Sequence, residues 1–215
     1  MNKIIIVDDH SLFREGIKLL IENENLGEVI AEAENGQAFL NLLASIKPDL
    51  VIMDIEMPVM GGLEATKKAL NIYPDLRILV LTMLNEKENY LGMINAGAMG
   101  FVLKTSGKQE FEKAICNIMN GESYFSNELL RRIILNTNSN SESEKQELHS
   151  EILTSREKET LQLLCEGMAV SEIAEKLFLS IKTIEAHRSM LLKKTNSKNT
   201  INLVLYAIKN KIVKI

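Results

Sequence analysis

Five polar side chains stand directly after short apolar runs of the sequence: Asp8, Asp9, Asp54, Thr82 and Lys104. The runs before them are rich in Ile, Val and Leu, which is typical of buried strands. In an open parallel sheet, the carboxyl ends of the strands share one edge, and ligands bind there. Three carboxylates held close together repel one another unless a cation neutralises them. We therefore expect a hard divalent ion with oxygen ligands at this edge, namely Mg²⁺.

Five apolar runs are predicted to be the strands that position these side chains, and they cover residues 4–7, 29–31, 50–53, 78–81 and 101–103. The segments between and after them have helical spacing and cover residues 11–24, 36–46, 63–72, 86–96 and 108–120. This alternation predicts an α/β domain with a five-stranded parallel, doubly wound, flavodoxin-like sheet covered by helices on both faces.

The chain of 215 residues is long enough for two domains. Its composition, 46% hydrophobic and 25% charged, excludes a mainly disordered, collagenous or disulfide-scaffold protein. No apolar run is long enough for a membrane span or a secretory signal, so we expect a cytoplasmic protein with no membrane partner. Both cysteines, Cys116 and Cys165, are interpreted as buried thiols, since their spacing suits neither a metal nor a disulfide.

Residues 137–147 contain no apolar side chain, so this stretch is predicted to be a flexible tether. We expect a first domain over 1–122, a linker over 123–150 that starts as helix and becomes polar and flexible, and a second domain over 151–215. Residues 1–137 carry 13 basic and 19 acidic side chains, whereas residues 151–215 carry 11 basic and 7 acidic ones. The excess of basic charge in the second domain favours a polyanionic partner, although a lysine-rich solvated surface would give the same count.

The second domain is predicted to be all-α, with four helices over 155–166, 171–178, 182–195 and 199–210. Thr154 and Glu157 have the spacing of a capping box, Gly167 suits a helix end, and Ser180 suits an N-cap. The second and third helices have helix-turn-helix character. Helical periodicity places Ile184, His187 and Leu191 on an inner face, and it places on the opposite, outer face Lys182, Glu185, Ala186, Ser189 and Lys193. A face with short side chains at its centre and basic ones at its ends suits a DNA major groove.

The first domain resembles the receiver domain of bacterial two-component response regulators over about residues 1–120. The resemblance is carried by Asp8-Asp9, Asp54-Ile-Glu-Met-Pro-Val-Met-Gly-Gly62, Thr82 and Gly97-Ala-Met-Gly-Phe-Val-Leu-Lys104. It implies that Asp54 is the phosphoacceptor and that Mg²⁺ is bound by Asp9, Asp54 and the main chain of Glu56, with Asp8 acting through water. Lys104 and Thr82 would contact phosphoryl oxygens. Phe101 stands where the family has an aromatic switch residue, although a plain core aromatic remains an alternative.

The second domain resembles the LuxR-type output domain of NarL/FixJ response regulators over residues 151–215. The shared pattern is Leu153-Thr-x-Arg-Glu157, Gly167, Ile173-Ala174, Leu177, Ser180 and Thr183-Ile-Glu-x-His-Arg188. The resemblance implies base contacts by Glu185, Ala186 and Ser189. It implies phosphate contacts by Lys182, Thr183, Arg188, Lys193, Lys194 and Lys198. His187 would be a partly buried structural residue that can also bond a phosphate.

Together these resemblances imply a transcriptional response regulator and not an enzyme. A sensor histidine kinase would phosphorylate Asp54, and the protein would assist its own Mg²⁺-dependent phosphorylation and dephosphorylation. The active form would be a homodimer on double-stranded DNA, because two half-sites raise affinity and specificity together. Dimerisation would use the apolar stripe of the last helix: Ile201, Val204, Leu205 and Ile208.

A few positions depart from the family pattern or stay ambiguous. Thr105 stands where many receivers have a proline in a cis peptide, so the backbone must position Lys104 differently. Gly62 or its neighbour is expected to adopt a positive φ before the next helix. His10 is interpreted as a surface residue rather than a metal ligand. Thr195 and Lys211 replace residues common in the family and carry no functional conclusion.

Three other functions fit these residues less well. A phosphohydrolase with an aspartyl nucleophile would need an acid/base Asp two residues after the nucleophile, where this chain has Glu56. A ligand-sensing LuxR-type regulator would need an aromatic-lined pocket, and this chain has no Trp. A pseudo-receiver that binds DNA regardless of phosphorylation is disfavoured because all five residues of the acceptor site are present.

Overall fold

The structure is a computed structural model of the whole chain, and it describes residues 1–83, 89–125, 153–168, 170–210 and 212–213. The chain divides into two compact units, Met1–Ser126 and Asn127–Ile215.

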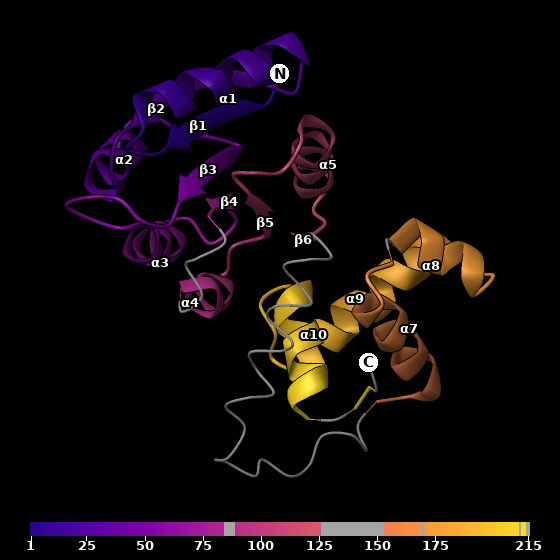
Figure 1. Cartoon of the computed structure of the whole chain (residues 1–215). Helices are drawn as coiled ribbons and strands as arrows, with labels where there is room; N and C mark the ends of the chain where they lie inside the picture. The colour runs from indigo at the N-terminus through magenta and orange to yellow at the C-terminus, as the bar shows by residue number, and fades with distance from the viewer. Residues whose placement is uncertain (84–88, 126–152, 169, 211, 214–215) are drawn as a thin grey trace. The chain divides into compact units, whose positions relative to one another are not determined.

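The first unit contains a parallel sheet with the strand order β2-β1-β3-β4-β5-β6 (Figure 1). Its strands are β1 (Lys3–Val7), β2 (Glu28–Ala33), β3 (Leu50–Asp54), β4 (Arg77–Thr82), β5 (Gly100–Leu103) and β6 (Tyr124–Phe125). The central strands β1, β3, β4 and β5 are buried along almost their whole length because helices cover both faces of the sheet. This arrangement confirms the predicted doubly wound α/β fold.

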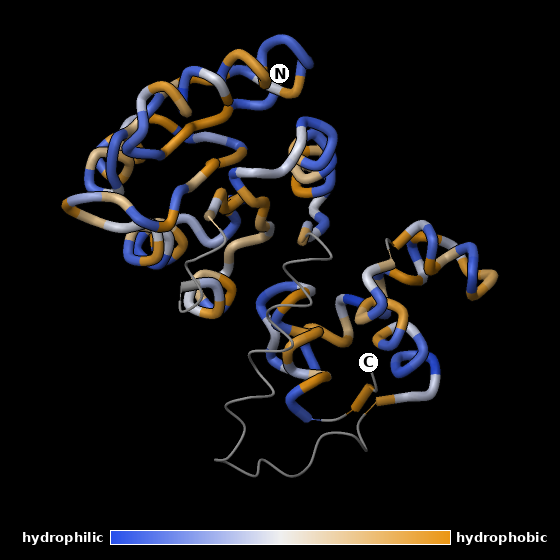
Figure 2. Tube along the Cα trace, viewed as in Figure 1, coloured by the Kyte–Doolittle hydropathy of each residue, from blue (hydrophilic) through white to orange (hydrophobic). Residues whose placement is uncertain are grey.

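The helices of the first unit are α1 (Ser11–Asn23), α2 (Gly36–Leu43), α3 (Gly62–Ile72), α4 (Asn89–Ala96) and α5 (Lys108–Met119). Alternate residues of the strands, among them Ile4, Ile52 and Leu79, pack with Ile21 of α1 and Phe111 of α5. Helices α2, α3 and α4 contact one another in sequence order and cover the opposite side of the sheet (Figure 1). The apolar stretches of the chain coincide with the strands and with the helix faces turned toward them (Figure 2).

The sheet has six strands, which corrects the prediction of five. The additional strand β6 pairs with β5 through the register Gly100↔Tyr124 and Phe101↔Phe125. It falls inside the stretch 123–150 that the sequence predicts to be linker. The rest of that stretch, including the polar tether over 137–147, lies outside the described residues.

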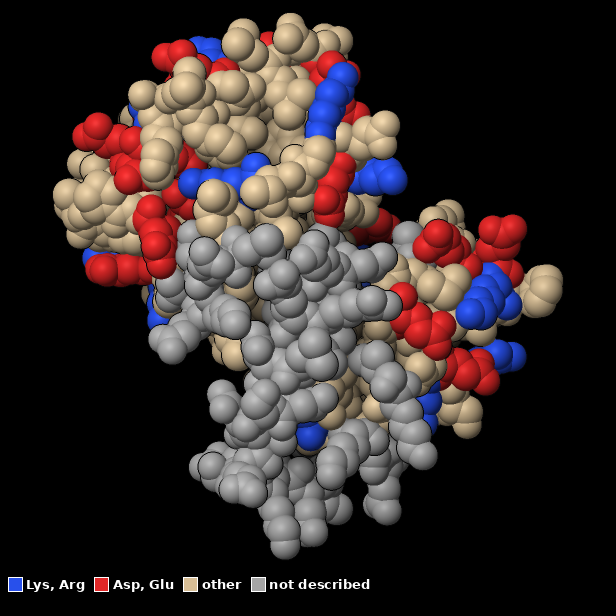
Figure 3. Space-filling view, in the orientation of Figure 1, with Lys and Arg blue, Asp and Glu red and all other residues tan. Residues whose placement is uncertain are grey.

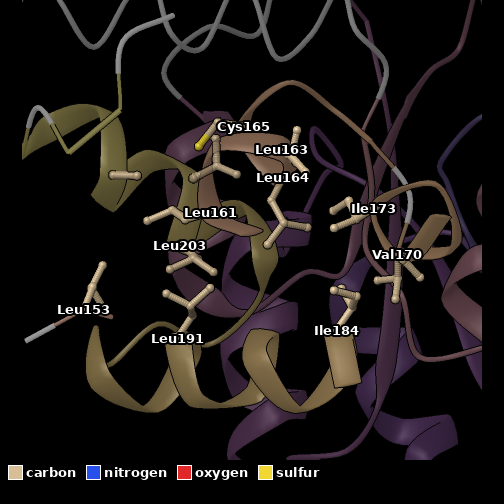
Figure 4. Packing of buried hydrophobic residues seen from close by; sticks show 13 residues of the cluster. Leu153, Leu161, Leu163, Leu164, Cys165, Val170, Ile173, Ile184, Leu191 and Leu203 are labelled. Atoms are coloured by element: carbon tan, nitrogen blue, oxygen red, sulfur yellow. The ribbon is translucent and has the colours of Figure 1, made fainter. Parts of the chain in front are cut away.

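The second unit is helical, as predicted. Its helices are α7 (Ser155–Cys165), α8 (Val170–Lys176), α9 (Ile181–Lys194) and α10 (Thr200–Lys209). Leu191 of α9 points toward Leu203 of α10, and Ile184 points toward Val170 and Ile173 of α8 (Figure 4). Thr154 and Glu157 form the predicted capping box, and Gly167 has the positive φ of a C-terminal glycine, +83°.

The two cysteines differ in environment. Cys165 is buried in the core of the second unit, as expected. Cys116 is exposed, which corrects the prediction that both thiols are buried. The buried stripe of α5 consists of Phe111, Ala114, Ile115 and Ile118, so Cys116 lies one position off it. No helix among the described residues is long and apolar enough to cross a membrane.

Candidate functional site

The carboxyl edge of the sheet brings together polar residues that are far apart in sequence. Asp54 is the last residue of β3, Thr82 the last of β4, and Asp8 and Lys104 directly follow β1 and β5. In the ladder between the two central strands, Asp54 lies opposite Leu81, the residue before Thr82. The parallel register therefore places side chains from four strands at one edge, as the sequence predicts.

Lys104 connects two buried carboxylates. Its Nζ lies 2.6 Å from Oδ2 of Asp54 and 2.8 Å from Oδ2 of Asp8. The Asp8 and Asp54 side chains are only 2% and 3% exposed, so this ammonium compensates charge that water cannot reach. Nζ also lies 5.0 Å from the centre of the Phe13 ring, which forms an apolar wall beside it.

The backbone positions Lys104 without a cis peptide. Every peptide bond among the described residues is trans. The amide of Lys104 donates to the carbonyl of Thr82 at 2.8 Å, which extends the β4–β5 ladder, and Ser106 then donates to the carbonyl of Leu103 at 2.8 Å. The turn at Thr105 thus replaces the proline that many receivers have at this position.

Burial sets the electrostatics of Asp54. Its pKa is raised from 3.8 to about 6, because the effect of burial exceeds the opposing effect of the hydrogen bond and charge of Lys104. Burial also lowers the pKa of Lys104, but its bonds to Asp54 and Asp8 outweigh this effect and leave that pKa above its ordinary value. The site therefore contains one buried ammonium, Lys104, between two buried carboxylates, Asp54 and Asp8. The second carboxylate leaves an excess of negative charge.

This excess fits a cation. Ligand atoms of Asp8, Asp9, His10 and Asp54 all lie within 4.8 Å of one another. Oδ2 of Asp8 is buried and, despite its ion pair with Lys104, has no hydrogen bond of good geometry among the described residues. Carboxylate oxygens are the ligands that Mg²⁺ prefers, so the donor set is compatible with this ion. The main chain of Glu56, two residues after Asp54, stays a predicted ligand.

His10 and Arg14 are closer to the site than the sequence indicates. The His10 side chain is 69% exposed, but its Nδ1 lies 2.8 Å from Oδ1 of Asp9 and 3.2 Å from Oδ1 of Asp8. Arg14 donates from Nη1 to the main-chain carbonyl of Asp8 at 2.7 Å. The only sequence signal for either residue is its position in the first turns after β1.

Gly62 is required by close packing and not by its backbone angle. It is the first residue of α3, and a Cβ there would lie 2.0 Å from the carbonyl oxygen of Asp54. Positive φ values occur among the described glycines at Gly97, Gly121 and Gly167, so the expected positive φ at Gly61 or Gly62 is wrong. The absent side chain lets the start of α3 touch the phosphoacceptor candidate.

The two switch candidates are both fully buried. Thr82 donates from Oγ1 to the carbonyl of Met83 at 3.2 Å, and Tyr90 donates to the same carbonyl at 2.7 Å. The Phe101 ring points inward between Tyr90, in a T-shaped contact at 6.4 Å, and Phe125, stacked at 5.3 Å. The sequence did not indicate that Tyr90 and Phe125 enclose this ring.

The surface of α9 has the predicted sidedness. Ile184 and Leu191 are buried, and the five predicted outer residues are all exposed, together with Ile181 and Met190: Lys182, Glu185, Ala186, Ser189 and Lys193. Thr183, His187 and Arg188 are half-buried, and Lys198 after the helix is exposed. Ser180 caps the helix by accepting from the amide of Thr183 at 3.1 Å. Acidic and basic side chains are mixed over α7 and α8 on the face shown in Figure 3, so the basic excess of the unit is not spread evenly.

Several predicted contact residues have partners inside the second unit. Nζ of Lys194 lies 2.7 Å from Oε2 of the buried Glu157, so this lysine holds α9 to the start of α7. In the predicted dimer stripe, Ile201 and Val204 are buried, and Ile208 packs partly against the same core. Val204 belongs to the core of its own unit, so it does not fit an interface in this conformation. Ile201 is buried outside that core cluster. Leu205 is partly exposed.

Both units match known families. Residues 4–116 match the response regulator receiver domain, and residues 151–207 match the bacterial regulatory proteins of the luxR family. The oxygen regulatory protein NreC of Staphylococcus aureus (strain bovine RF122 / ET3-1) is 36% identical over 214 residues, which cover 98% of this chain and 99% of the relative.

Two solved structures extend the similarity to three dimensions. RcsB from Salmonella enterica serovar Typhimurium, bound to promoter rprA in the presence of the phosphomimetic BeF3-, has a TM-score of 0.58 and 28% identity and covers 98% of this chain and 100% of its own. A structure of two RcsB dimers bound to two parallel DNAs has a TM-score of 0.58 and 28% identity, with 95% and 96% covered.

An acidic site at the edge of a doubly wound sheet, followed by a helix-turn-helix unit, defines a two-domain response regulator that regulates transcription. The chain belongs to the NarL/FixJ-type response regulators.

Proposed function

We propose that this response regulator accepts a phosphoryl group on Asp54 from a sensor histidine kinase and binds double-stranded DNA through α9 as a dimer. The observation that carries the proposal is the buried arrangement at the sheet edge. Asp54 lies 2.6 Å from Nζ of Lys104 and within one cluster with Asp8 and Asp9. Phosphoryl transfer mainly needs an aligned nucleophile and neutralised charge, and this arrangement can supply both.

Asp54 is the nucleophile of the proposed reaction. A carboxylate oxygen of Asp54 attacks the phosphorus of a phosphohistidine, the P–N bond breaks, and the leaving imidazole takes up a proton. The product is an acyl phosphate on Asp54. The Oδ1 atom accepts a hydrogen bond from the Ile55 amide at 2.8 Å, which fixes the orientation of the carboxylate.

Asp8, Asp9, Asp54 and the main-chain carbonyl of Glu56 would hold Mg²⁺. When bound, the ion neutralises negative charge on the transferring oxygens. Lys104 would exchange its contact with Asp54 for a phosphoryl oxygen, and its ion pair with Asp8 at 2.8 Å keeps it close.

Thr82 and Phe101 would report phosphorylation. Thr82 now donates to the carbonyl of Met83, and donation to a phosphoryl oxygen would draw the end of β4 toward Asp54. Phe101 is packed inward between Tyr90 and Phe125, so movement of this loop changes the space available to its ring. Phosphorylation would thereby shift the receiver between two populations.

The exposed face of α9 would read DNA. Glu185, Ala186 and Ser189 would contact bases, and the exposed Lys182, Lys193 and Lys198 would contact phosphates together with Thr183, His187 and Arg188. Lys194 would act mainly through Glu157. The relative RcsB binds DNA as dimers, and here a dimer contact through α10 would use the partly exposed Leu205 and Ile208.

Intact mass after incubation with Mg²⁺ and acetyl phosphate tests this proposal. We expect the gain of one phosphoryl group, its loss in Asp54→Asn, and dimerisation by analytical ultracentrifugation. Asp75→Asn is the matched control, because it makes the same substitution at an exposed carboxylate outside the site, and this variant should still be phosphorylated. Unchanged phosphorylation of Asp54→Asn would refute the assignment. Failure of the wild type to gain mass would favour a pseudo-receiver.

A further inference from the structure

Phe178 is the most exposed large apolar side chain among the described residues, at 95%. It also has a φ of +56°, a left-handed conformation that bulky side chains rarely adopt. Of the other three described non-glycine residues with positive φ, Asn25 and Asn196 are of a type that tolerates it, and Val59 of the first unit is an exposed apolar residue, as Phe178 is. The exposed ring contributes nothing to the core, and strained residues of this kind cluster where proteins contact ligands or switch conformation.

The neighbours of Phe178 fix the direction of its ring. Leu177 and Leu179 on either side pack against the core of the second unit. The Phe178 amide donates to the carbonyl of Glu175 at 3.2 Å, and the Leu179 amide donates to that of Ala174 at 2.9 Å. With leucines anchored on both sides and the turn closed by these hydrogen bonds, the ring lies in solvent, away from the core of its unit.

This turn leads directly into α9. Ser180 caps the helix two residues after Phe178, and Ile181, the first residue of α9, is itself 53% exposed. The next residue, Lys182, is exposed and makes no ion pair with any residue that the structure describes. Phe178 and Ile181, called here the turn patch, therefore adjoin the cationic end of the face proposed to read DNA.

We propose that the turn patch is an apolar part of the DNA interface, with Phe178 contacting a thymine methyl group or a deoxyribose at the edge of the major groove. The proposal rests on the proposed DNA-binding role of α9. Duplex DNA is the occupant favoured by position, because in helix-turn-helix proteins the first residues of the recognition helix lie at the base edges. Phenylalanine is among the side chains that contact thymine methyl groups.

Phe178→Asn tests the proposal, because asparagine removes the ring and tolerates the positive φ. The full chain, treated with acetyl phosphate and Mg²⁺, is titrated with a labelled 30-bp duplex that the wild-type protein selects from a random library. We expect about a tenfold loss of affinity, the effect of losing one buried apolar contact. The melting temperature of the second unit should stay the same or rise by a few degrees.

Two control variants separate the apolar contact from other effects. Phe178→Leu keeps an apolar side chain at the strained position and should retain most of the affinity. Ile72→Gln removes another exposed apolar side chain, 64% exposed on α3 of the first unit, and should not change DNA binding. The slope of log affinity against log salt should be the same for Phe178→Asn as for wild type, because no phosphate contact is lost.

Replacing the selected duplex's thymines one at a time by uracil locates the contact. If one uracil lowers the DNA affinity of the wild type but not that of Phe178→Asn, the ring contacts the methyl group of the thymine that was replaced. If no uracil does so while the tenfold loss remains, the ring contacts a deoxyribose. Unchanged affinity of Phe178→Asn for DNA overturns the proposal. If this variant binds DNA as the wild type does but no longer supports transcription, the turn patch would be assigned to a contact with RNA polymerase. Failure of the wild type to select any duplex would instead refute the DNA-binding role itself.

Discussion

Phe101 and Phe125 stack with their ring centres 5.3 Å apart and their planes at 28°, which joins the switch candidate of β5 to the short strand β6. The ladder between these strands is two residues long. A ladder this short is weak by itself, so the stacked rings contribute much of the attachment of β6.

Phe125→Ala should loosen this end of the sheet. Removal of the stacked ring is expected to cost about 1–2 kcal/mol of local stability. Hydrogen exchange of peptides that cover residues 98–125 measures this effect, since the Tyr124 amide donates to the carbonyl of Met99. Phe125→Tyr keeps the ring and should exchange like the wild type. Equal protection in Phe125→Ala would show that the ladder alone holds β6.

The strands and the acceptor site could be predicted from the sequence because of simple physical constraints. A strand buried on both faces must be continuously apolar, so Ile4–Val7 and the later runs are distinct from the helices. A polar residue that ends such a strand, such as Asp54, lies at the sheet edge by geometry alone. The strand β6 was missed because two residues show no periodicity, although Tyr124 and Phe125 are both of a type that favours strands.

Other features of the sites depend on contacts between distant residues. Lys194 is one of several lysines near the end of α9, and nothing in its spacing predicts that Glu157, 37 positions earlier, is its partner. The reason for Gly62 is the carbonyl of Asp54 against which it packs. The α10 stripe is a correct helical pattern, but Val204 and Ile208 in it pack against the core of the same unit. Periodicity identifies a buried face but not what covers it.

Asp54→Asn should stabilise the Mg²⁺-free receiver at neutral pH. Burial raises the pKa of Asp54 to about 6, so the folded protein binds this proton more tightly than the unfolded chain does, and stability falls as pH rises from about 4 through 6. Asparagine has no such penalty, and the variant should exceed the wild type by about 1–3 kcal/mol at pH 7.5. The difference should disappear near pH 3.5, as measured by urea unfolding. A difference that does not change with pH would contradict the buried carboxylate.

Lys104→Met should slow phosphorylation, and methionine replaces the ammonium beside the Phe13 ring by an uncharged side chain of similar length. Methionine has no charge to neutralise a phosphoryl oxygen, and we expect a rate loss of about 10²–10³-fold with acetyl phosphate. Lys108→Met is the matched control, since Lys108 pairs with Glu24 on the surface. This variant should be phosphorylated on Asp54 at the wild-type rate. Phosphorylation of Lys104→Met at the wild-type rate would remove Lys104 from the mechanism.

Glu157→Gln should destabilise the second unit in a pH-dependent way. Burial alone raises the pKa of Glu157, but bonds from Lys194 and Thr154 outweigh it and leave that pKa below 4.5. The ionised group therefore contributes stability above that pH, and the contribution is lost as pH falls through the folded-state pKa. We expect the variant to lose about 1–2 kcal/mol of stability at pH 7 and less near pH 3. Hydrogen exchange of the α7 amides measures both losses. Lys194→Met should give the same loss, and the two effects should not add.

Substitutions along α9 should separate base reading from charge. Glu185 is exposed on the outer face and can accept a hydrogen bond from a cytosine amino group, so Glu185→Ala should relax selection at one base pair by about 1–3 kcal/mol. Lys193→Ala should instead weaken binding to all sequences and reduce the salt slope by about one. Lys194→Ala is the comparison, because its ammonium lies 2.7 Å from Glu157. Lys194→Ala should lower the stability of the second unit and leave the salt slope unchanged. A reduced slope would show that Lys194 contacts a phosphate after all.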